Sequence, residues 1–336
     1  MIAVGKVTGE DRIVDKIRGL ATNSPGLTIG PGDDAAVVDR AAGLLAATTD
    51  MLVEGVDFLP GEDPERLGRR AVAVNLSDLA AMGAEPEFFL LSIAVPADRG
   101  EEVPLGIVRG AIARAAAHGA ALAGGDLSAA PLLVVSIAFW GRPAGDPLTR
   151  SGASPGDLVY VTGHPGDAAA GLRLAAAVSP DLLDLAAADR QSLLAAFRDP
   201  EPRVAFGAWL GRERLATAAI DVSDGLGLDA GRLARASGVR LSLERERLPV
   251  SPALAAFGAA SGVDPIELAI AGGDDYELLF TVREADAPRL ADKADALDVP
   301  IRAIGRVSSG SGAVLSDSRN ERDIASLGHD HFRASR

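Results

Sequence analysis

Short apolar runs alternate with longer amphipathic segments along most of the 336-residue chain. Runs such as FFLLSIAV and PLLVVSIAFW have the length of buried strands, whereas the segments between them repeat apolar residues at helical spacing. The alternation predicts a mixed α/β protein. We expect strands at Gly43–Asp50, Phe88–Val95, Leu132–Trp140, Leu158–Thr162, Ala216–Asp221, Tyr276–Val282 and Ile301–Val307. We expect helices at Glu10–Leu20, Pro64–Met82, Val103–Ala117, Ala168–Ala177, Arg203–Leu210, Leu226–Ala236 and Ala285–Ala296.

The length of the chain exceeds that of one ordinary hydrophobic core, so two domains are expected. The segment TRSGASPGDLVYVTGHPG is rich in Gly, Pro and Ser, and it precedes a new strand. It is the best candidate for a linker, which gives domains at residues 1–148 and 149–336.

A sequence pattern recurs in the two halves. Ser77-Asp78 is followed by Gly-Gly-Asp ending at Asp126, and Ser223-Asp224 is followed by Gly-Gly-Asp ending at Asp274. The shared order suggests two related halves. Chance is the other reading, because Gly-Gly-Asp is a short sequence in a glycine-rich chain.

Composition narrows the class of protein. Hydrophobic residues make up 48% of the chain and charged residues 24%, which is enough for a substantial core. The net charge of −14 argues against nucleic-acid binding. There is no cysteine, which excludes disulfides, thiolate nucleophiles and cysteine-based zinc sites. The early polar residues and short apolar runs predict neither a signal peptide nor a membrane span, so we expect a soluble cytoplasmic protein.

Aspartates recur where apolar runs meet small residues, at Asp33, Asp34, Asp50, Asp78, Asp126, Asp221, Asp224, Asp274 and Asp275. Each alone is an ordinary turn or cap residue. Because strand ends of an α/β sheet meet at one edge, we expect several of these carboxylates to lie together. They would repel one another without bound cations, and oxygen ligands select Mg²⁺, Ca²⁺ or Mn²⁺.

Other chemistry finds little support in the sequence. There is no phosphate-binding loop of the GxxxxGK[ST] type, no kinase glycine loop, no EF-hand and no G-x-S-x-G motif. The four histidines have no metal-ligand spacing, and lysine occurs only at Lys6, Lys16 and Lys293. A bound phosphate would therefore meet arginine, backbone N–H groups or a metal ion.

Eight motifs stand in a characteristic order: GDDAAVV, TTDMLVEG, AVNLSDLAAMGAEP, AGGDLS, LTRSGASPGD, VTGHPGDAAAGL, IDVSDGL and GGDDYELLF. In this order they resemble the thiamine-monophosphate kinases of the aminoimidazole-ribonucleotide-synthetase-like ATP-binding superfamily. The motifs extend from about Gly30 to Phe280, and Asp330-His331-Phe332 follows near the end.

The resemblance implies an α/β (α+β) fold of two domains. The N-terminal domain would have a mixed sheet, bind ATP and Mg²⁺, and pair with its twin through β-strands in a homodimer. The C-terminal α/β domain would cover the active site. The implied reaction is phosphorylation of thiamine monophosphate by ATP to thiamine diphosphate, with several Mg²⁺ ions, as a step of thiamine diphosphate biosynthesis.

The resemblance also implies the site residues. The metal ligands would be Asp34, Thr48, Thr49, Asp50, Asp78, Asp126, Asp221 and Asp224, the threonines through hydroxyl or backbone oxygen. ATP would contact Gly125, Asp126, Arg150 and Ser223, and thiamine monophosphate would contact Asp57 and Asp274. No covalent nucleophile or strong general base is expected, because the accepting phosphate oxygen is largely ionised near neutral pH. We expect direct in-line transfer without a phosphoenzyme.

Three departures from the family pattern concern the acceptor. Asp57 stands where histidine is usual, and Asp274 where glutamate is common. Near the end of the chain, SLGHDHF has Ser326 and Gly328 where the family often has an aromatic residue. Asp57 and Asp274 together could read the positive charge of thiamine; a tolerated substitution is the other reading.

Two other functions stay open at this point. One is another ATP-dependent synthetase of the superfamily, similar to aminoimidazole ribonucleotide synthetase. The other is a non-catalytic regulator that binds magnesium and nucleotide. Superfamily enzymes with a reactive cysteine or selenocysteine are disfavoured, because the chain has no cysteine.

Overall fold

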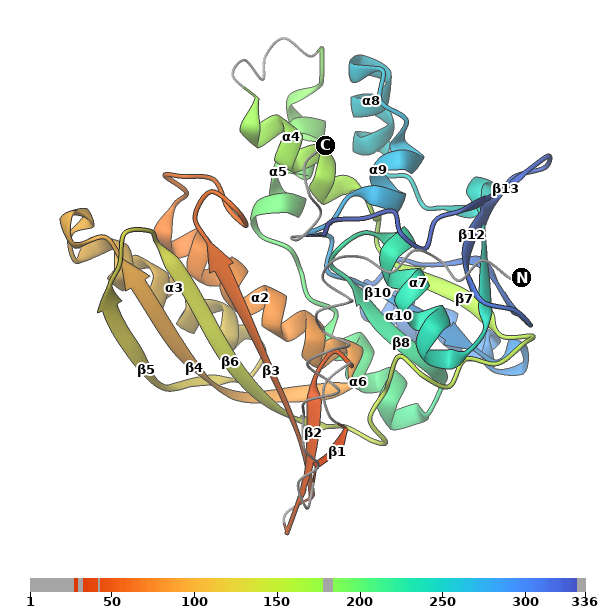
Figure 1. Cartoon of the computed structure of the whole chain (residues 1–336), viewed down its shortest axis with the longest axis horizontal. Helices are drawn as coiled ribbons and strands as arrows, with labels where there is room; N and C mark the ends of the chain where they lie inside the picture. Colours follow the sequence, from red (N-terminus) through yellow and green to blue (C-terminus); the bar gives the residue numbers. More distant parts are fainter. Residues whose placement is uncertain (1–26, 30–32, 42, 178–183, 331–336) are drawn as a thin grey trace.

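The computed structural model describes residues 27–29, 33–41, 43–177 and 184–330. Figure 1 shows two β-sheets side by side, each with helices against it. The predicted mixed α/β fold with two sheet-containing parts is confirmed. The helix expected at Glu10–Leu20 lies outside the described residues.

The N-terminal sheet has the strand order β1-β2-β3-β6-β4-β5. Its strands are β1 (Leu27–Ile29), β2 (Ala36–Arg40), β3 (Gly43–Val53), β4 (Ala84–Val95), β5 (Ala121–Ala129) and β6 (Val134–Pro143). Neighbours are antiparallel except β4 and β5, which are parallel. The sheet is therefore mixed, as predicted.

Two helices cover one face of this sheet, α2 (Pro64–Ala81) and α3 (Glu102–Ala117), and the 3₁₀ turn η1 (Ala97–Arg99) precedes α3. Strand β4 shows the two faces by its alternation, since Phe89 and Leu91 are buried while Phe88 and Leu90 are exposed. Within the described residues no helix covers the second face, which we call the open face.

The C-terminal sheet has the order β13-β12-β9-β11-β7-β10-β8. Its strands are β7 (Leu158–Thr162), β8 (Ala216–Val222), β9 (Arg240–Glu244), β10 (Glu277–Val282), β11 (Ile301–Ser308), β12 (Gly312–Ser316) and β13 (Glu321–Asp323). Only β9 and β12 run parallel. The other elements are α4 (Asp167–Ala176), α5 (Ala187–Arg198), α6 (Val204–Glu213), α7 (Leu226–Ser237), η3 (Arg245–Arg247), α8 (Pro252–Ser261), α9 (Pro265–Ala271), η4 (Glu284–Asp286) and α10 (Pro288–Ala296).

Helix α2 lies between the two sheets and positions the residues discussed below. Asp63 starts the helix by accepting a hydrogen bond from Arg66 N, with Pro64 in the first turn. The helix then contacts β3, β4 and β6 on one side and α6, β8 and β10 on the other. One hydrophobic cluster accordingly includes Leu79 of α2, Phe89 of β4 and Phe280 of β10. Side chains of α2 can therefore face the C-terminal sheet.

Among the described residues, no single helix is long and apolar enough to cross a membrane. Helices α8 and α9 reach that length and composition only as a pair, bent by 112° at the break between them.

Candidate active site

A cavity of about 830 Å³ lies between α2 and β3 on one side and the C-terminal part of the chain on the other. It is lined by most of the residues expected in a site: Asp34, Thr48, Thr49, Asp50, Asp57, Asp78, Arg150, Asp221, Ser223, Asp224 and Asp274. Gly125 and Asp126 do not line this cavity of the single chain.

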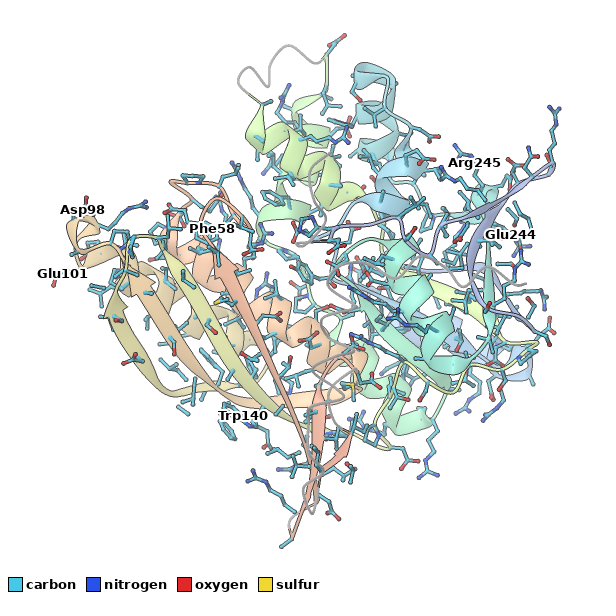
Figure 2. All side chains as sticks on the ribbon, viewed as in Figure 1. Phe58, Asp98, Glu101, Trp140, Glu244 and Arg245 are labelled. Carbon is cyan, nitrogen blue, oxygen red and sulfur yellow. The ribbon has the colours of Figure 1, made fainter. Side chains whose placement is uncertain are left out.

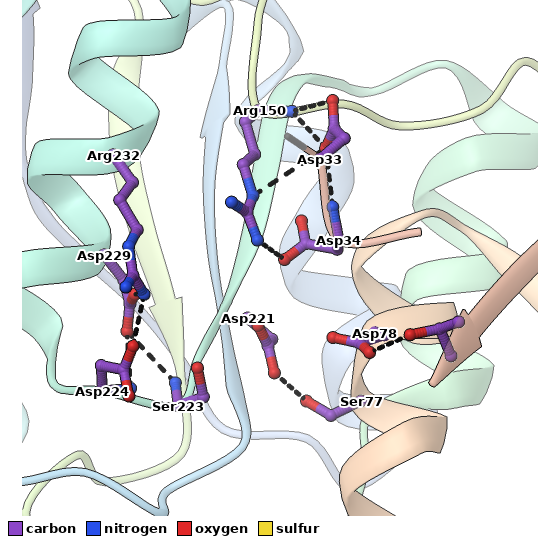
Figure 3. Close-up of polar contacts among 11 residues, drawn as sticks. Asp33, Asp34, Ser77, Asp78, Arg150, Asp221, Ser223, Asp224, Asp229 and Arg232 are labelled. Atoms are coloured by element: carbon purple, nitrogen blue, oxygen red, sulfur yellow. Dashed lines mark hydrogen bonds and ion pairs between the residues drawn. The ribbon is translucent and has the colours of Figure 1, made fainter. Parts of the chain in front are cut away.

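Three carboxylates form the centre of the cavity wall. Asp34 precedes β2, Asp78 lies in α2, and Asp221 lies in β8. One carboxylate oxygen of each lies within 4.8 Å of the others, and Figure 3 shows the three side chains grouped around one space. We call these three residues the carboxylate cluster.

The reason for this grouping differs from the expected one. Most neighbouring strands in both sheets are antiparallel, so the carboxyl ends of the strands do not all lie at one edge. Asp50 lies within a strand and Asp78 within a helix, and it is the packing of α2 between β3 and β8 that brings them together. The sequence repeat likewise does not mark equivalent positions, since Asp78 is helical whereas Asp224 lies in the loop before α7.

The electrostatics of the cluster are unfavourable without a cation. Withdrawal from water, with neighbouring aspartates adding to it, raises the pKa of Asp78 and of Asp221 well above the usual carboxyl value. The same cause raises the pKa of Asp50 to about 6. Oδ2 of Asp34 is buried and has no hydrogen-bond partner among the described residues. Buried, repelling oxygen ligands with an open lone pair fit a hard divalent cation.

Hydrogen bonds fix the directions of these carboxylates. Ser77 Oγ donates to Asp221 at 2.8 Å, and the hydroxyl of Thr48 donates to Asp78. The hydroxyl of Thr49 instead donates to the carbonyl of Ile137 at 2.9 Å. The Thr48 hydroxyl is therefore held beside the cluster, whereas the Thr49 hydroxyl is directed toward the backbone of β6.

Arg150 supplies positive charge beside the cluster. Its Nη2 donates to Asp34 Oδ1 at 2.6 Å, and its backbone N–H donates to Asp33 Oδ1 at 3.1 Å. Burial, reinforced by Asp34, raises the pKa of Asp33 to about 6. A guanidinium on the cavity wall next to a metal-type site suits a phosphate group.

The loop between β8 and α7 is held by two residues that sequence reasoning missed. Buried Asp229 accepts hydrogen bonds from the backbone N–H groups of Ser223 at 3.1 Å and Asp224 at 3.0 Å. Arg232 Nη1 donates to Asp229 at 2.8 Å and also pairs with Asp224 (Figure 3). A carboxylate in the first turn of the predicted helix was the available signal.

The two residues expected to contact thiamine monophosphate also line the cavity. Asp57 follows β3, and its Oδ2 accepts a hydrogen bond from Val53 N at 2.7 Å. Asp274 lies in the loop between α9 and β10, and its Oδ1 is 2.9 Å from Arg70 Nη2. The charge of Asp274 is therefore already paired with that of Arg70, which the sequence did not indicate.

The end of the described chain also reaches the cavity through Gly328 and His329. A Cβ atom on Gly328 would lie 2.6 Å from the carbonyl oxygen of Asp224. An aromatic residue at this position would therefore require the backbone to move. Ser326 is half-buried, and His331 and Phe332 lie outside the described residues.

Gly125 and Asp126 lie in β5, the edge strand of the N-terminal sheet. Asp126 is exposed and stands opposite Ser92 of β4 in the parallel register. Asp126 therefore lies on the open face of the sheet, because Ser92 alternates with the buried Leu91 and Ile93, whereas Gly125 stands opposite Leu91.

The two-sheet fold and the carboxylate-lined cavity place the chain in the family of AIR synthase related proteins. The model of the N-terminal domain of these proteins matches residues 32–142, and the model of their C-terminal domain matches residues 154–318. Within this family, the chain belongs to the thiamine-monophosphate kinases. It is 36% identical over 337 residues to the thiamine-monophosphate kinase of Escherichia coli (strain K12), covering 98% of this chain and 99% of the relative.

Solved structures agree with this assignment. The thiamine-monophosphate kinase of Stenotrophomonas maltophilia K279a superposes with a TM-score of 0.76 at 36% identity, over 92% of this chain and 97% of that one. A structure described as "AaThiL complexed with AMPPCP and TMP" has a TM-score of 0.81 at 29% identity, over 95% and 97% of the two chains. The family resemblance drawn from the eight motifs is confirmed.

Proposed function

We propose that this protein transfers a phosphoryl group from ATP to thiamine monophosphate, giving thiamine diphosphate and ADP. The observation that carries the proposal is the carboxylate cluster next to Arg150 on the wall of one cavity. Relatives at 36% identity are thiamine-monophosphate kinases, and a similar structure is complexed with AMPPCP and TMP. Such a site is suited to neutralising and aligning phosphates, which is most of what phosphoryl transfer requires.

We propose that the carboxylate cluster and its neighbours hold several Mg²⁺ ions. The ligands would be Asp34, Asp50, Asp78, Asp221 and Asp224 with the Thr48 hydroxyl and the Thr49 backbone oxygen, all on the cavity wall. When bound, the ions supply positive charge that offsets the charge of the phosphates. The unpartnered Asp34 Oδ2 and the raised pKa values of Asp50 and Asp78 support this assignment.

The protein's own groups then need only to hold the two substrates in line. Arg150 and Ser223 would contact the phosphates of ATP, and Asp57 and Asp274 would contact thiamine monophosphate. The accepting phosphate oxygen is largely ionised near neutral pH, so no side chain has to remove a proton from it. We therefore propose direct in-line transfer without a covalent intermediate on the protein.

We further propose a homodimer formed through the open face of the N-terminal sheet. This face exposes apolar side chains, with Met51 59% and Leu90 40% exposed. Phe88 stacks on Trp140 with their ring centres 5.2 Å apart; Figure 2 labels Trp140 on the N-terminal sheet. Large exposed apolar groups on one sheet face favour a protein interface. In this arrangement residues 1–148 would bind ATP and Mg²⁺ and form the dimer, and residues 149–336 would cover the site.

The dimer gives Gly125 and Asp126 their function. Asp126 lies on the open face, and neither residue lines the cavity of its own chain. We propose that a partner copy brings its Asp126 to the cavity, where the residue completes the metal and ATP site.

The test is ADP release from ATP and Mg²⁺ with thiamine monophosphate, compared with a panel of other phosphorylated acceptors, together with identification of the product. Release that depends on thiamine monophosphate and yields thiamine diphosphate supports the proposal. Release with a different acceptor would favour a superfamily synthetase, and nucleotide binding without release would favour a regulator. Isolation of a phosphorylated protein during turnover would contradict direct transfer.

A further inference from the structure

Arg70 is a buried cation in contact with Asp274, a residue that lines the cavity. It lies in α2 and is only 3% exposed. Its guanidinium lies 4.4 Å from the centre of the Phe197 ring of α5, and Nη2 lies 2.9 Å from Asp274 Oδ1. Neither Nε nor Nη2 forms a hydrogen bond among the described residues, so the contact of Nη2 with Asp274 is an ion pair. Burial of an incompletely bonded charge lowers stability, so the residue calls for an explanation other than packing.

The partner of Arg70 is held in an unusual backbone conformation. Asp274 has φ +69° and Tyr276 has φ +52°, values that residues with a Cβ rarely adopt. The loop is fixed by Asp274 N, which donates to Ser223 O at 2.7 Å, and by Tyr276 N, which donates to Val222 O at 2.8 Å. These bonds place the Asp274 carboxylate at the cavity, where its side chain is 30% exposed.

The two oxygens of this carboxylate have different surroundings. Oδ1 accepts a hydrogen bond from Tyr276 OH at 3.0 Å and faces Arg70 Nη2 at 2.9 Å. Oδ2 has no hydrogen-bond partner within the described residues, and it is not buried. Oδ2 is therefore the oxygen that Asp274 presents to the cavity.

We propose that Arg70 is a positioning residue that determines acceptor specificity, a role that rests on the function proposed above. By binding Oδ1, Arg70 offsets the charge of Asp274 and directs Oδ2 into the cavity as a hydrogen-bond acceptor. Asp274 then recognises a neutral N–H donor, such as the amino group on the pyrimidine ring of thiamine, and is not a counter-ion for the thiazolium. Asp57, which has no ion pair within the described part of the chain, is the carboxylate left to face the positive charge.

The proposal predicts a specific pattern of kinetic change for Arg70→Met. The KM for thiamine monophosphate rises roughly tenfold, because a charge-assisted contact that orients the carboxylate is lost. The KM for ATP and the thermal midpoint stay near their wild-type values. The wild type prefers thiamine monophosphate to the analogue whose pyrimidine amino group is replaced by oxygen, and Arg70→Met loses most of that preference. Arg70→Lys recovers part of it, because lysine keeps the charge without the planar fork.

The matched control is Arg69→Met on the same helix. Arg69 also forms an ion pair, with Asp199 at 3.1 Å, but it is partly exposed, and its partner, unlike Asp274, does not line the cavity. This variant should leave the KM for both substrates and the acceptor preference unchanged. Tyr276→Phe is the second test variant, since it removes only the other donor to Oδ1 and should raise the acceptor KM by a smaller factor.

Unchanged acceptor KM and preference in Arg70→Met would overturn the proposal. So would an equal rise in both KM values together with a lower thermal midpoint, because that pattern indicates a general structural role. If Arg70→Met does not fold, an unchanged KM for thiamine monophosphate in Tyr276→Phe would also overturn the proposal. The affinity for thiamine monophosphate, measured by calorimetry for the wild type and Arg70→Met, repeats the comparison without turnover. A wild type that neither binds nor phosphorylates thiamine monophosphate would instead refute the proposed function.

Discussion

The two Gly-Gly-Asp sequences of this chain are alike in letters and different in structure. Gly124-Gly125-Asp126 lies in the edge strand β5, whereas Gly272-Gly273-Asp274 forms the loop between α9 and β10. What they share is a close backbone approach at the second glycine. A Cβ on Gly125 would lie 1.9 Å from Leu91 O, and one on Gly273 would lie 2.5 Å from Ser223 O. The shared sequence thus reflects a shared need for a residue without a side chain, not a shared position in the fold.

The aspartates of the two sequences differ in the same way. Asp126 is exposed on the open face of its sheet. Asp274 is tied to Arg70 across the two parts of the chain, and the next residue, Asp275, is buried and accepts hydrogen bonds from Gly166 N at 2.8 Å and Ala168 N at 3.2 Å. The first sequence therefore exposes its aspartate to a possible partner molecule, whereas the aspartates of the second sequence bind groups of their own chain.

The largest effect is expected from Asp126→Asn. If a partner copy delivers Asp126 to the metal and ATP site, kcat should fall by roughly a hundredfold or more because a charged ligand is lost. The thermal midpoint should not change, since the side chain is exposed. Asp98→Asn in η1, at the outer edge of the same sheet (Figure 2), is the control and should have wild-type kcat. A fully active Asp126→Asn would remove this residue from the site.

A mixing experiment separates action across the dimer from action within one chain. Asp126→Asn and Asp78→Asn are each expected to be inactive. In their mixed dimer, one of the two sites combines an intact Asp78 with the partner's intact Asp126. Random pairing makes half of the dimers mixed, so about a quarter of wild-type activity should return. No recovery after subunit exchange would contradict the assignment to the partner copy.

The next effect concerns the second sequence and stability. Asp275→Asn replaces an oxygen that accepts a backbone hydrogen bond at the start of α4 with an amide donor. The free energy of unfolding should fall by about 2 kcal/mol, measured by urea denaturation. The exposed Asp126→Asn serves as the comparison and should leave this free energy unchanged. Equal stability of the two variants would mean that the second sequence is not held by its own chain as described.

A smaller kinetic effect is expected at Asp274. Asp274→Asn keeps the shape of the side chain, so the KM for thiamine monophosphate should rise about tenfold while kcat changes less. Measuring both parameters for both substrates distinguishes this proposed acceptor role from the metal role proposed for Asp78. A loss confined to kcat would show that the two Gly-Gly-Asp sequences serve the same chemistry after all.

The smallest effect concerns the thermal midpoint, which Mg²⁺ should raise by an amount that depends on pH. Burial raises the pKa of Asp50 to about 6 and the pKa values of Asp78 and Asp221 well above the usual carboxyl value, so protons compete with a cation for these groups more strongly at pH 5 than at pH 7.5. Mg²⁺ should raise the thermal midpoint by about a few degrees at pH 7.5 and by less at pH 5. Without Mg²⁺ the folded state binds more protons than the unfolded one, so stability should fall as pH rises from about 4 through 6. A shift of equal size at both pH values would contradict the assignment of these ligands.

The long, strongly patterned elements could be predicted from the sequence. Helix α2 begins at the predicted Pro64 and ends one residue before the predicted end. The glycines in ALAGGDLSA hid strand β5, because glycine-rich segments are typical of loops. Helices α8 and α9 were not predicted, because both are short. They are nevertheless capped by Ser251-Pro252 and Asp264-Pro265, which are good starts for a helix.

The site was predicted through the family motifs more than through physical reasoning. The strand-end argument expected several of the aspartates to lie together, and Asp34, Asp78 and Asp221 do, but Asp78 reaches the cluster from a helix. Arg70 was missed although it falls among buried positions of α2, where a charge signals a specific partner. That partner is more than 200 residues further on, and no local pattern could have identified it.

The carboxylate cluster also determines whether the gene could be divided into two parts. Asp34 and Asp78 come from the part built on the first sheet, and Asp221 comes from the part built on the second. A cation shared by all three would cross-link the two parts, and neither part carries a complete set of ligands. Division of the gene between the sheets would therefore abolish the site in both products, unless the two fragments reassembled.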